Sequence, residues 1–543
     1  MKPRCCYVPY FVARAPASRK TDLVKGAPQL HSATIDAIDA ITTSRVAGID
    51  LAFENKPRTV HEVSAAVRTT HAAWRWCSAG YNVQDGRYHV AGDTVEIFNT
   101  GIISTDNFPW TTCPSKRDDP TKLHFKLWDD RLAQALRLPP QGPLRTENES
   151  WHTVTDHIHV FSAFLVTTME RAIHITSLVR KYDPKRVGML LRHPPLVCII
   201  RTPNATVIRK AHIRRVFTYF GPTFDNTLIL CPPPREAFPE DDDVRVAVAA
   251  RGATASSLGW LPLHRPPRKS KKKCCAICVR PLFGALSLWK IVEFIANYRA
   301  MGATSFYFYD LYMTSDLKLL FARMQSLGVD LTLVTFKLIV DTTVIDRDVH
   351  ANGQMPALYD CIFRSLSKMQ YYMHVDIDEL MVPLRNSSIS TIVWKMERKH
   401  KRSIGTLVVP MRYHCSEYPL NLRYAQHEYL PLQTRLFTYH SASLRRMGTK
   451  YIARSRTVCD PCVHHVESHC AKTTRHVHIR KSAIIKHYRQ CCDYSRSSEH
   501  DKVASFYNVT RLYPDYKFEE LSARIVGDPV VRALRGLIVL TPF

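Results

Sequence analysis

The chain lacks a hydrophobic run near its start that is long enough to cross a membrane. A membrane-spanning helix needs about 20 predominantly apolar residues. Residues 1–13 offer only a short apolar stretch, which Pro9 interrupts. The same stretch is a poor match to the apolar core of a secretory signal. The sequence therefore shows neither a membrane anchor nor a typical leader.

Acidic residues are scarce relative to basic ones. The 543 residues include 75 Lys and Arg against 48 Asp and Glu, a formal net charge of +27. Such an excess suits nucleic acid, an anionic membrane surface or anionic sugar ligands. The basic residues are scattered, however, apart from two short runs at 265–273 and 399–402. Since no nucleic-acid recognition motif is apparent, we expect no nucleic-acid partner and interpret both runs as solvated surface.

The chain also lacks the closely spaced C-x2-C pairs of common zinc modules. The pair at Cys459 and Cys462 is followed closely by other candidate ligands, at a spacing too short for a typical zinc finger. These residues are Cys459, Cys462, His464, His465, His469 and Cys470. A small structural zinc site at 459–470 is therefore the weaker alternative to disulfide bonds.

Disulfide bonds are the favoured interpretation of the cysteines. The 16 cysteines are an even number, as pairing in a secretory compartment allows. Four N-x-S/T sequons are consistent with the same compartment. They begin at Asn148, Asn204, Asn386 and Asn508.

Helix and strand patterns alternate between residues 286 and 375. Leu288, Ile291, Val292 and Ile295 follow helical spacing and predict a helix over roughly 286–300. Gly302 then fits just past its end.

The alternation continues with aromatic and β-branched strands. Strands are predicted at 305–309 and 329–336, with a helix between them that Thr314 can cap. A third helix leads into the strand 371–375. Strands that alternate with helices imply right-handed crossovers and a mostly parallel sheet, so the predicted fold class is α/β.

Two aspartates, Asp376 and Asp378, follow the strand 371–375. Side chains spaced i, i+2 point the same way, so both carboxylates can face the crevice where ligands of open α/β folds bind. Hard oxygen ligands there suit a Mg²⁺ or Mn²⁺ ion that holds a nucleotide diphosphate. Taken alone, two such acids more often lie in a solvated loop. The surrounding sequence must therefore decide between a loop and a metal site.

An ordered series of sequence blocks surrounds the two aspartates. In chain order it comprises Cys278–Leu282, Trp289 with Glu293–Gly302, Phe306–Asp310, Gly353 and Gln354 with Asp360, Cys361 and Arg364, Val375–Glu379 with Pro383, Lys450–Arg456 with Val463–His465, and Ile485–Arg489. Together with His159–Phe164 upstream, this series resembles glycosyltransferase family 92. The resemblance spans roughly residues 151–495 and rests on the order of the blocks.

The resemblance implies a GT-A type fold and an inverting transfer of a hexose from a UDP-sugar to a hydroxyl of a glycan or glycoprotein. The hexose is galactose in the better understood relatives. Such a transfer needs a cation, Mn²⁺ or Mg²⁺, an aligned acceptor hydroxyl and a carboxylate that takes its proton. Asp378 is the first choice as metal ligand, with Asp376 beside it contacting the metal or the ribose. Glu379 is expected to contact these ligands without touching the metal itself.

The resemblance also guides the domain boundaries. The proline-broken basic run before residue 274 predicts a linker. We expect a stem-like or unassigned region at 1–150, a β-containing accessory region at 151–263, a basic linker at 264–273, a GT-A-like catalytic domain at 274–495 and a C-terminal extension at 496–543.

Three more residues of the blocks are candidates to face the nucleotide. Asp310 ends the first predicted strand, where a turn or helix-capping role is equally expected. Asp360 and Arg364 lie at i, i+4 on one helix, where an exposed ion pair is the alternative. Gln354 follows Gly353 and is interpreted as part of the start of that helix.

Histidines after the two aspartates are candidates to complete the metal shell. Many GT-A enzymes use such a histidine, and a neutral imidazole can join carboxylates around Mn²⁺. His487 is slightly favoured, with His464 and His465 as the other candidates and a structural role as the alternative for each. The general base stays unassigned among Glu417, Asp460, Glu467 and Asp493.

The resemblance implies the lumen of the Golgi or secretory pathway and a membrane anchor. Because no anchor is visible, we expect either a start downstream of one or a different route of entry. Two other functions remain open. The first is a non-catalytic sugar-binding relative of the same fold, and the less favoured one is a basic protein that binds zinc or nucleic acid.

Overall fold

The computed structural model describes residues 120–540 with gaps, together with short strands between residues 82 and 104. The described ranges after residue 119 are 120–138, 142–167, 171–182, 191–216, 223–234, 243–253, 258–265, 273–339, 349–385, 387–400, 404–426, 428–441, 445–470, 475–490 and 511–540. Residues 1–100 and 101–543 are two separate compact units. The first contains a small antiparallel sheet of β1 (Asn82–Gln84), β2 (Arg87–Val90) and β3 (Asp93–Val95).

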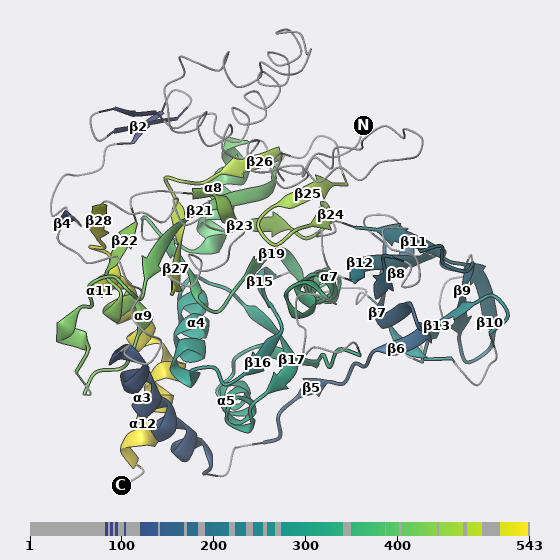
Figure 1. Cartoon of the computed structure of the whole chain (residues 1–543), viewed down its shortest axis with the longest axis horizontal. Coiled ribbons are helices and arrows are strands. Elements are labelled where there is room, and N and C mark those ends of the chain that lie inside the picture. The colour runs from purple at the N-terminus through teal and green to yellow at the C-terminus, as the bar shows by residue number, and fades with distance from the viewer. Residues whose placement is uncertain are drawn as a thin grey trace, which may run out of the picture. The chain divides into compact units, whose positions relative to one another are not determined.

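An eleven-stranded sheet is the framework of the second unit (Figure 1). Its main path runs β20-β27-β21-β23-β19-β15-β17-β18-β5, with β16 beside β17 and β26 beside β21. The strands are β5 (Thr146–Glu147), β15 (Lys273–Val279), β16 (Leu282–Gly284), β17 (Ser305–Met313), β18 (Leu331–Thr335), β19 (Met369–Val375), β20 (Glu379–Pro383), β21 (Ile404–Cys415), β23 (Arg445–Arg454), β26 (Arg475–His478) and β27 (Ala483–Arg489).

The half of this sheet from β19 to β5 is parallel throughout. Antiparallel pairs join β23 to both β19 and β21, and β20 to β27. Parallel pairs therefore predominate, and the predicted α/β class is confirmed.

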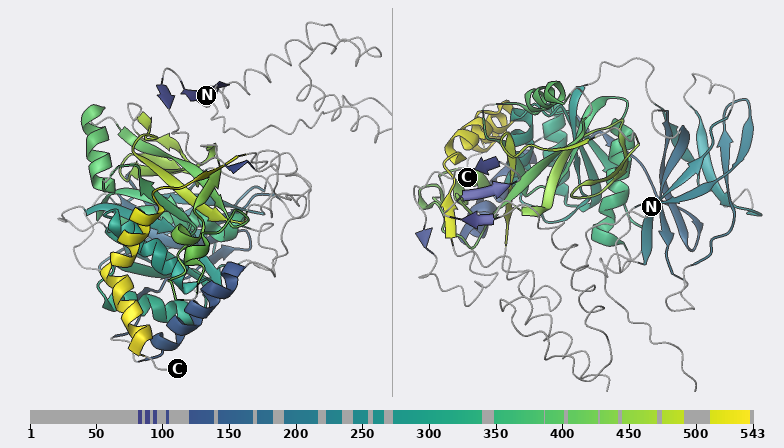
Figure 2. Two further views of the ribbon diagram at one scale, coloured as in Figure 1. Left: turned by 90° about the vertical axis from the view of Figure 1, so that its left-hand side faces the viewer. Right: turned by 90° about the horizontal axis from the view of Figure 1, so that it is seen from above.

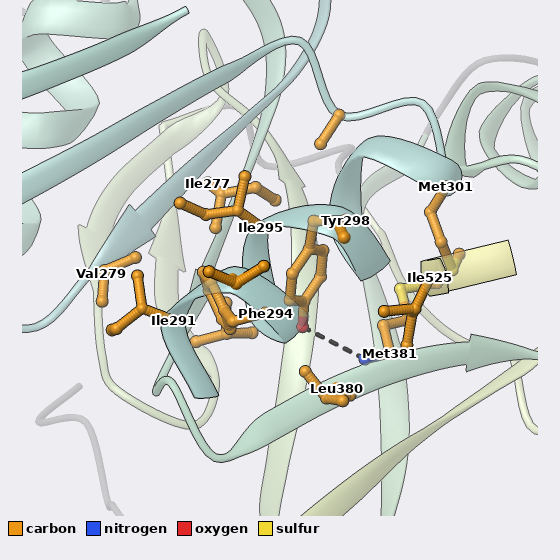
Figure 3. Packing of buried hydrophobic residues seen from close by; sticks show 14 of the residues in the cluster. Ile277, Val279, Ile291, Phe294, Ile295, Tyr298, Met301, Leu380, Met381 and Ile525 are labelled. Atoms are coloured by element: carbon orange, nitrogen blue, oxygen red, sulfur yellow. Dashed lines mark hydrogen bonds between the residues drawn. The ribbon is translucent and has the colours of Figure 1, made fainter. Parts of the chain in front are cut away.

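The predicted helices are present with small changes at their ends. They are α4 (Leu288–Ala300), α5 (Ser315–Ser326) and α7 (Gln354–Ser365). Thr314 caps α5 as expected, because its hydroxyl accepts the N–H of Leu317 at 3.4 Å. The apolar face of α4 packs on β15 and β20 (Figure 3), and the backbone N–H of Met381 donates to the Tyr298 hydroxyl at 3.2 Å.

Helices outside the predicted set also cover this framework. They are α3 (Pro120–Leu136), α8 (Ile389–Lys399), α9 (Gln433–Leu436), α11 (Phe518–Gly527) and α12 (Pro529–Leu540). Figures 1 and 2 show α3 and α12 side by side although they lie near opposite ends of the second unit's sequence. The Trp289 indole of α4 donates to the Trp128 carbonyl of α3 at 3.0 Å, so α3 is part of the main core.

A second, nine-stranded sheet spans residues 152–264. Its order is β10-β9-β13-β14-β7-β8-β12-β11, with β6 beside β7. The strands are β6 (His152–Thr155), β7 (Ile158–Val166), β8 (Ala172–Arg180), β9 (Leu196–Arg201), β10 (Thr206–Lys210), β11 (His212–Arg215), β12 (Phe224–Cys231), β13 (Arg245–Ala250) and β14 (Leu261–His264). A disulfide joins Cys198 of β9 to Cys231 of β12, strands far apart in this order, so the sheet folds over its own apolar core.

The other face of this accessory sheet packs against α7. The ring of Phe363 on α7 lies 5.8 Å from Phe164 and 5.1 Å from His174, measured between ring centroids. A second disulfide, Cys278–Cys361, joins α7 to β15 of the eleven-stranded sheet. Helix α7 is therefore held from both sides.

Two small sheets complete the second unit. One contains β4 (Ile103–Ser104), β22 (Tyr439–Ser441) and β28 (Arg511–Pro514), and the other pairs β24 (Val458–Pro461) with β25 (Val466–His469). A disulfide between Cys459 and Cys470 closes the second of these. The expected disulfides are thus confirmed at three places, while no helix in the described ranges is long and apolar enough to span a membrane.

Candidate active site

The two aspartates lie where the parallel strands end. Strand β19 finishes at Val375, Asp376 and Asp378 occupy the turn that follows, and Glu379 begins β20. The parallel strands β15, β17 and β18 end at the same edge of the sheet. This is the edge where open α/β sheets bind ligands.

Asp376 is paired with a lysine that is entirely shielded from water. The ammonium of Lys450, on β23, lies 3.4 Å from Asp376 Oδ2 and 3.0 Å from Glu379 Oε2, and its side chain is 0 % exposed. Burial alone would raise the pKa of Asp376, but Lys450 outweighs this effect and holds that pKa well below its usual range. Asp376 is therefore a fixed, ionised group.

Glu379 closes the turn from beneath. Its carboxylate accepts the backbone N–H of Asp376 at 2.9 Å and also faces Lys450. Burial raises the pKa of Glu379 to about 7, against the opposing effect of Lys450. These contacts fix the turn that carries both aspartates.

Asp378 meets His487 across the sheet. Strands β20 and β27 pair Glu379 with His487, and His487 Nε2 donates to Asp378 Oδ2 at 3.2 Å. Burial lowers the pKa of His487, but Asp378 raises it above its ordinary value, and His487 in turn lowers the pKa of Asp378. Asp378 remains 35 % exposed, so this pair opens toward solvent.

Gln354, at the first position of α7, contacts the same turn. Its Nε2 lies 2.9 Å from His374 Nε2 and 3.4 Å from Asp376 Oδ1. His374 Nδ1 donates to the Cys278 carbonyl at 3.1 Å. Gln354 therefore links β15, β19 and α7 around Asp376, which its sequence position alone did not indicate.

The backbone before Gln354 is strained. Ala351, Asn352 and Gly353 adopt φ values of 46°, 57° and 77° in succession, and only the last is a glycine. Non-glycine residues in this left-handed region cost about 1–3 kcal/mol each and gather at functional sites. Here they bring the start of α7 against the aspartate turn.

Two further histidines were candidate metal ligands. Burial lowers the pKa of His464 to about 3, and the nearby charges of Lys450 and Asp376 also act on it, so His464 lies close to the turn. The imidazole of His465 instead pairs with Glu467 at 3.0 Å. Of the three candidates, only His487 contacts Asp378 directly.

Asp310 lies inside β17 rather than just after it. Its carboxylate accepts the Met313 N–H at 2.8 Å and pairs with Lys318 of α5 at 2.7 Å. These contacts match the turn role, and its contact with a nucleotide stays a prediction.

Asp360 and Arg364 form an ion pair, but the pair is buried rather than exposed. Two nitrogens of Arg364 lie 3.0 Å from the Asp360 oxygens, and Arg364 also contacts Glu149 at 3.0 Å. Asp360 accepts the Tyr309 hydroxyl at 2.6 Å. The pair thus joins α7 to Glu149, in the segment before the accessory sheet, and to Tyr309 of β17, and its predicted contact with the nucleotide stays a prediction.

Three candidates for the general base already contact other side chains. Asp460 pairs with Arg214 at 2.6 Å and accepts the Ser468 hydroxyl. Glu467 pairs with His465, and Glu417 accepts the Ser416 hydroxyl. Asp493 lies outside the described residues. The base therefore stays unassigned.

Asp378 and His487 are the side chains that could hold a divalent cation. Among the described residues, no three His, Cys, Asp or Glu side chains form a metal cage. A carboxylate and an imidazole suit Mn²⁺, and such ions often complete their shell with substrate phosphates and water. The pair therefore fits a cation shared with a bound diphosphate.

The alternative zinc site at 459–470 loses two of its six candidate ligands. Cys459 and Cys470 are joined in a disulfide. Disulfide sulfur no longer offers the thiolate that zinc binds.

Comparison with protein families supports the sequence resemblance. Residues 273–525, just under half of the chain, match the family model described as glycosyltransferase family 92. A search of curated proteins found no match. The matched segment contains the aspartate turn, Lys450, Gln354 and His487.

Proposed function

Because residues 273–525 match the model of glycosyltransferase family 92, we propose that the protein is a metal-assisted glycosyltransferase that moves a hexose from a UDP-sugar to a glycan hydroxyl with inversion. The family indicates a glycosyltransferase with a sugar donor and a glycan acceptor. Galactose is our first choice of hexose, and the sequence resemblance is what supports it. The lumen of the secretory pathway is the proposed location, which the disulfides also favour.

The contact between Asp378 and His487 is the observation that carries the metal-dependent part of the proposal. It joins a carboxylate and an imidazole at the edge where the parallel strands end, and Asp378 is partly exposed to solvent. Mn²⁺ or Mg²⁺ bound there would neutralise charge on the leaving diphosphate.

The other residues of the turn would hold this pair in place. Lys450 and Glu379 fix Asp376, so its carboxylate can accept a hydroxyl of the donor without changing its own position. Arg280 follows β15 and contributes positive charge that Asp376 and His374 sense, which suits an anionic donor. Such preorganised charges stabilise a transition state more than flexible ones do.

A donor screen tests the proposal. The full chain, incubated with Mn²⁺, an acceptor glycan panel and separate UDP-hexoses, should transfer one hexose in preference to the others. Asp378→Asn should lower kcat by about 10²–10³ because one charge-stabilising contact is lost.

The matched control is Asp243→Asn, which alters a carboxylate of the accessory region that is 73 % exposed. We expect it to leave the rate unchanged. If EDTA and Asp378→Asn both leave transfer at the parent rate, the metal assignment fails. Sugar binding without transfer by the parent chain would identify a non-catalytic relative instead.

A further inference from the structure

A tight hairpin joins β9 to β10 in the accessory sheet. The strands pair Arg201 with Thr206, which leaves residues 202–205 as the tip. The Thr202 N–H donates to the Ala205 carbonyl at 2.8 Å, and the Ala205 N–H donates to the Thr202 hydroxyl at 3.0 Å. The tip is thus closed without any help from the side chain of Asn204.

Asn204 is an exposed residue of this tip and the first residue of a sequon. Within the described part of the chain its carboxamide makes no hydrogen bond, and Ala205 and Thr206 complete the N-x-T pattern. Both of these residues are exposed as well. A large group attached to Asn204 would therefore displace none of the described contacts.

The sequon at Asn148 provides a contrast. The Asn148 side chain accepts the Thr146 hydroxyl at 3.1 Å, and the Ser150 hydroxyl of the sequon lies 3.2 Å from His152 Nε2. Between them, Glu149 is buried and holds Arg364. The side chains of this sequon are engaged in local hydrogen bonds, whereas the side chains of Asn204 and Thr206 have none among the described contacts. The sequons at Asn386 and Asn508 begin outside the described residues.

Strand β10 is the edge of the accessory sheet. Among the described strands it pairs only with β9, and its Thr206, Ile208 and Lys210 side chains are exposed. Ile208 is 60 % exposed. An edge strand with an exposed apolar residue is prone to pair with other chains unless something covers it.

We propose that Asn204 carries an N-linked glycan and that this glycan shields the β10 edge from association with other chains. In the reaction, the Asn204 amide nitrogen bonds to the anomeric carbon of an oligosaccharide carried on a lipid diphosphate. The bond from that carbon to the diphosphate breaks, and one amide proton is released. The inference rests on the lumenal location in the proposed function.

Peptide mapping tests the modification. The full chain, made in an animal cell line, is digested with and without prior treatment with peptide N-glycosidase. The Asn204 peptide should appear only after treatment, converted to aspartate. Asn204→Gln and Thr206→Ala should each remove one glycan from the intact mass, while Asn148→Gln should leave the Asn204 peptide modified.

An unmodified Asn204 peptide overturns the inference. This failure is distinct from failure of the proposed function: an active transferase with bare Asn204 contradicts only the modification, whereas a modified but inactive chain contradicts only the transferase.

Size-exclusion chromatography tests the shielding. Asn204→Gln should increase the aggregated fraction, and the double variant Asn204→Gln/Ile208→Lys should restore the monomer, because a charge on an edge strand opposes pairing. Equal monomer fractions for parent and Asn204→Gln would overturn the shielding role while leaving the modification in place.

Discussion

At the level of single residues, the Asp378–His487 contact joins groups that lie 109 positions apart in the sequence. Both were identifiable beforehand, Asp378 from its place after a strand and His487 from its sequence block. Their contact depends on the pairing of β20 with β27, which no local pattern reveals.

Replacement of His487 tests its proposed role as a metal ligand. His487→Ala should raise the Mn²⁺ concentration needed for half-maximal transfer by at least about 10-fold, as loss of groups at metal sites commonly does. The melting temperature without metal should change little in comparison. Mn²⁺ titrations of transfer, with melting curves in EDTA, provide the measurement.

His464→Ala and His465→Ala are the controls, because neither imidazole contacts Asp378. Both should require the same Mn²⁺ concentration as the parent. If instead His487→Ala matches the parent and His464→Ala does not, the histidine that completes the shell has been misassigned.

The burial and the contacts of Lys450 could not be predicted from the sequence pattern. The sequence places it within a block, yet its lack of solvent exposure and its contacts with Asp376 and Glu379 depend on β23 lying beside β19. A buried ammonium is tolerated only when it is paired. The need for such a partner could have been inferred from Asp376 and Glu379, but its identity could not.

At the level of elements, helices were predicted better than the segments between them. The apolar spacing of α4 and the capping residue of α5 are local signals, and both elements formed as expected. Strand β17 runs past its predicted end to Met313, since β16 pairs alongside it. The left-handed segment before α7 was not predicted, because Ala351 disfavours that conformation, although Asn352 and Gly353 tolerate it.

Gly353 immediately precedes α7, and a single substitution there can test the importance of this strained backbone. A Cβ at this position would lie 2.9 Å from a ring carbon of Phe336, and φ is +77°. Gly353→Ala should therefore destabilise the protein by about 1–3 kcal/mol from backbone strain, with an added cost from the ring contact. It should also reduce transfer, since Gln354 follows directly.

Gly328→Ala is the matched control for this strain. Gly328 has a φ of +82°, but a Cβ there meets nothing within 4 Å. Urea unfolding should thus give a smaller loss of stability for Gly328→Ala and no change in transfer. Equal losses for the two variants would show that the Phe336 contact has no role.

At the level of the whole molecule, the division into regions at 1–150, 151–263, 264–273, 274–495 and 496–543 stays a prediction. Its outer regions contribute more to the catalytic framework than their sequences suggested. Strand β5, from the first region, pairs with β18, and α12, from the last, packs against α3 and α4. Such long-range partners leave no periodic signal that a local reading can detect.

The disulfides join elements that are distant in the sequence, and the final prediction concerns their effect on stability. Cys278–Cys361 closes a loop across 83 positions between β15 and α7, and Cys198–Cys231 closes one of 33 across the accessory sheet. Loops of these lengths restrict the unfolded chain by about 3–5 kcal/mol each in the chain-entropy description. Reductant should therefore lower the melting temperature clearly, as measured by calorimetry with and without a phosphine reductant.

Thiol counting under denaturing conditions separates this effect from a general action of the reductant. Cys274 and Cys275 form no disulfide in the described part of the chain and should be alkylated without reduction, whereas Cys278 and Cys361 should not. Cys278→Ser/Cys361→Ser should reproduce part of the loss of stability and also weaken transfer, because the same bond holds α7 and Gln354 against the aspartate turn. If these four cysteines are all alkylated in unreduced protein, the oxidised compartment and the support of α7 by this bond are both wrong.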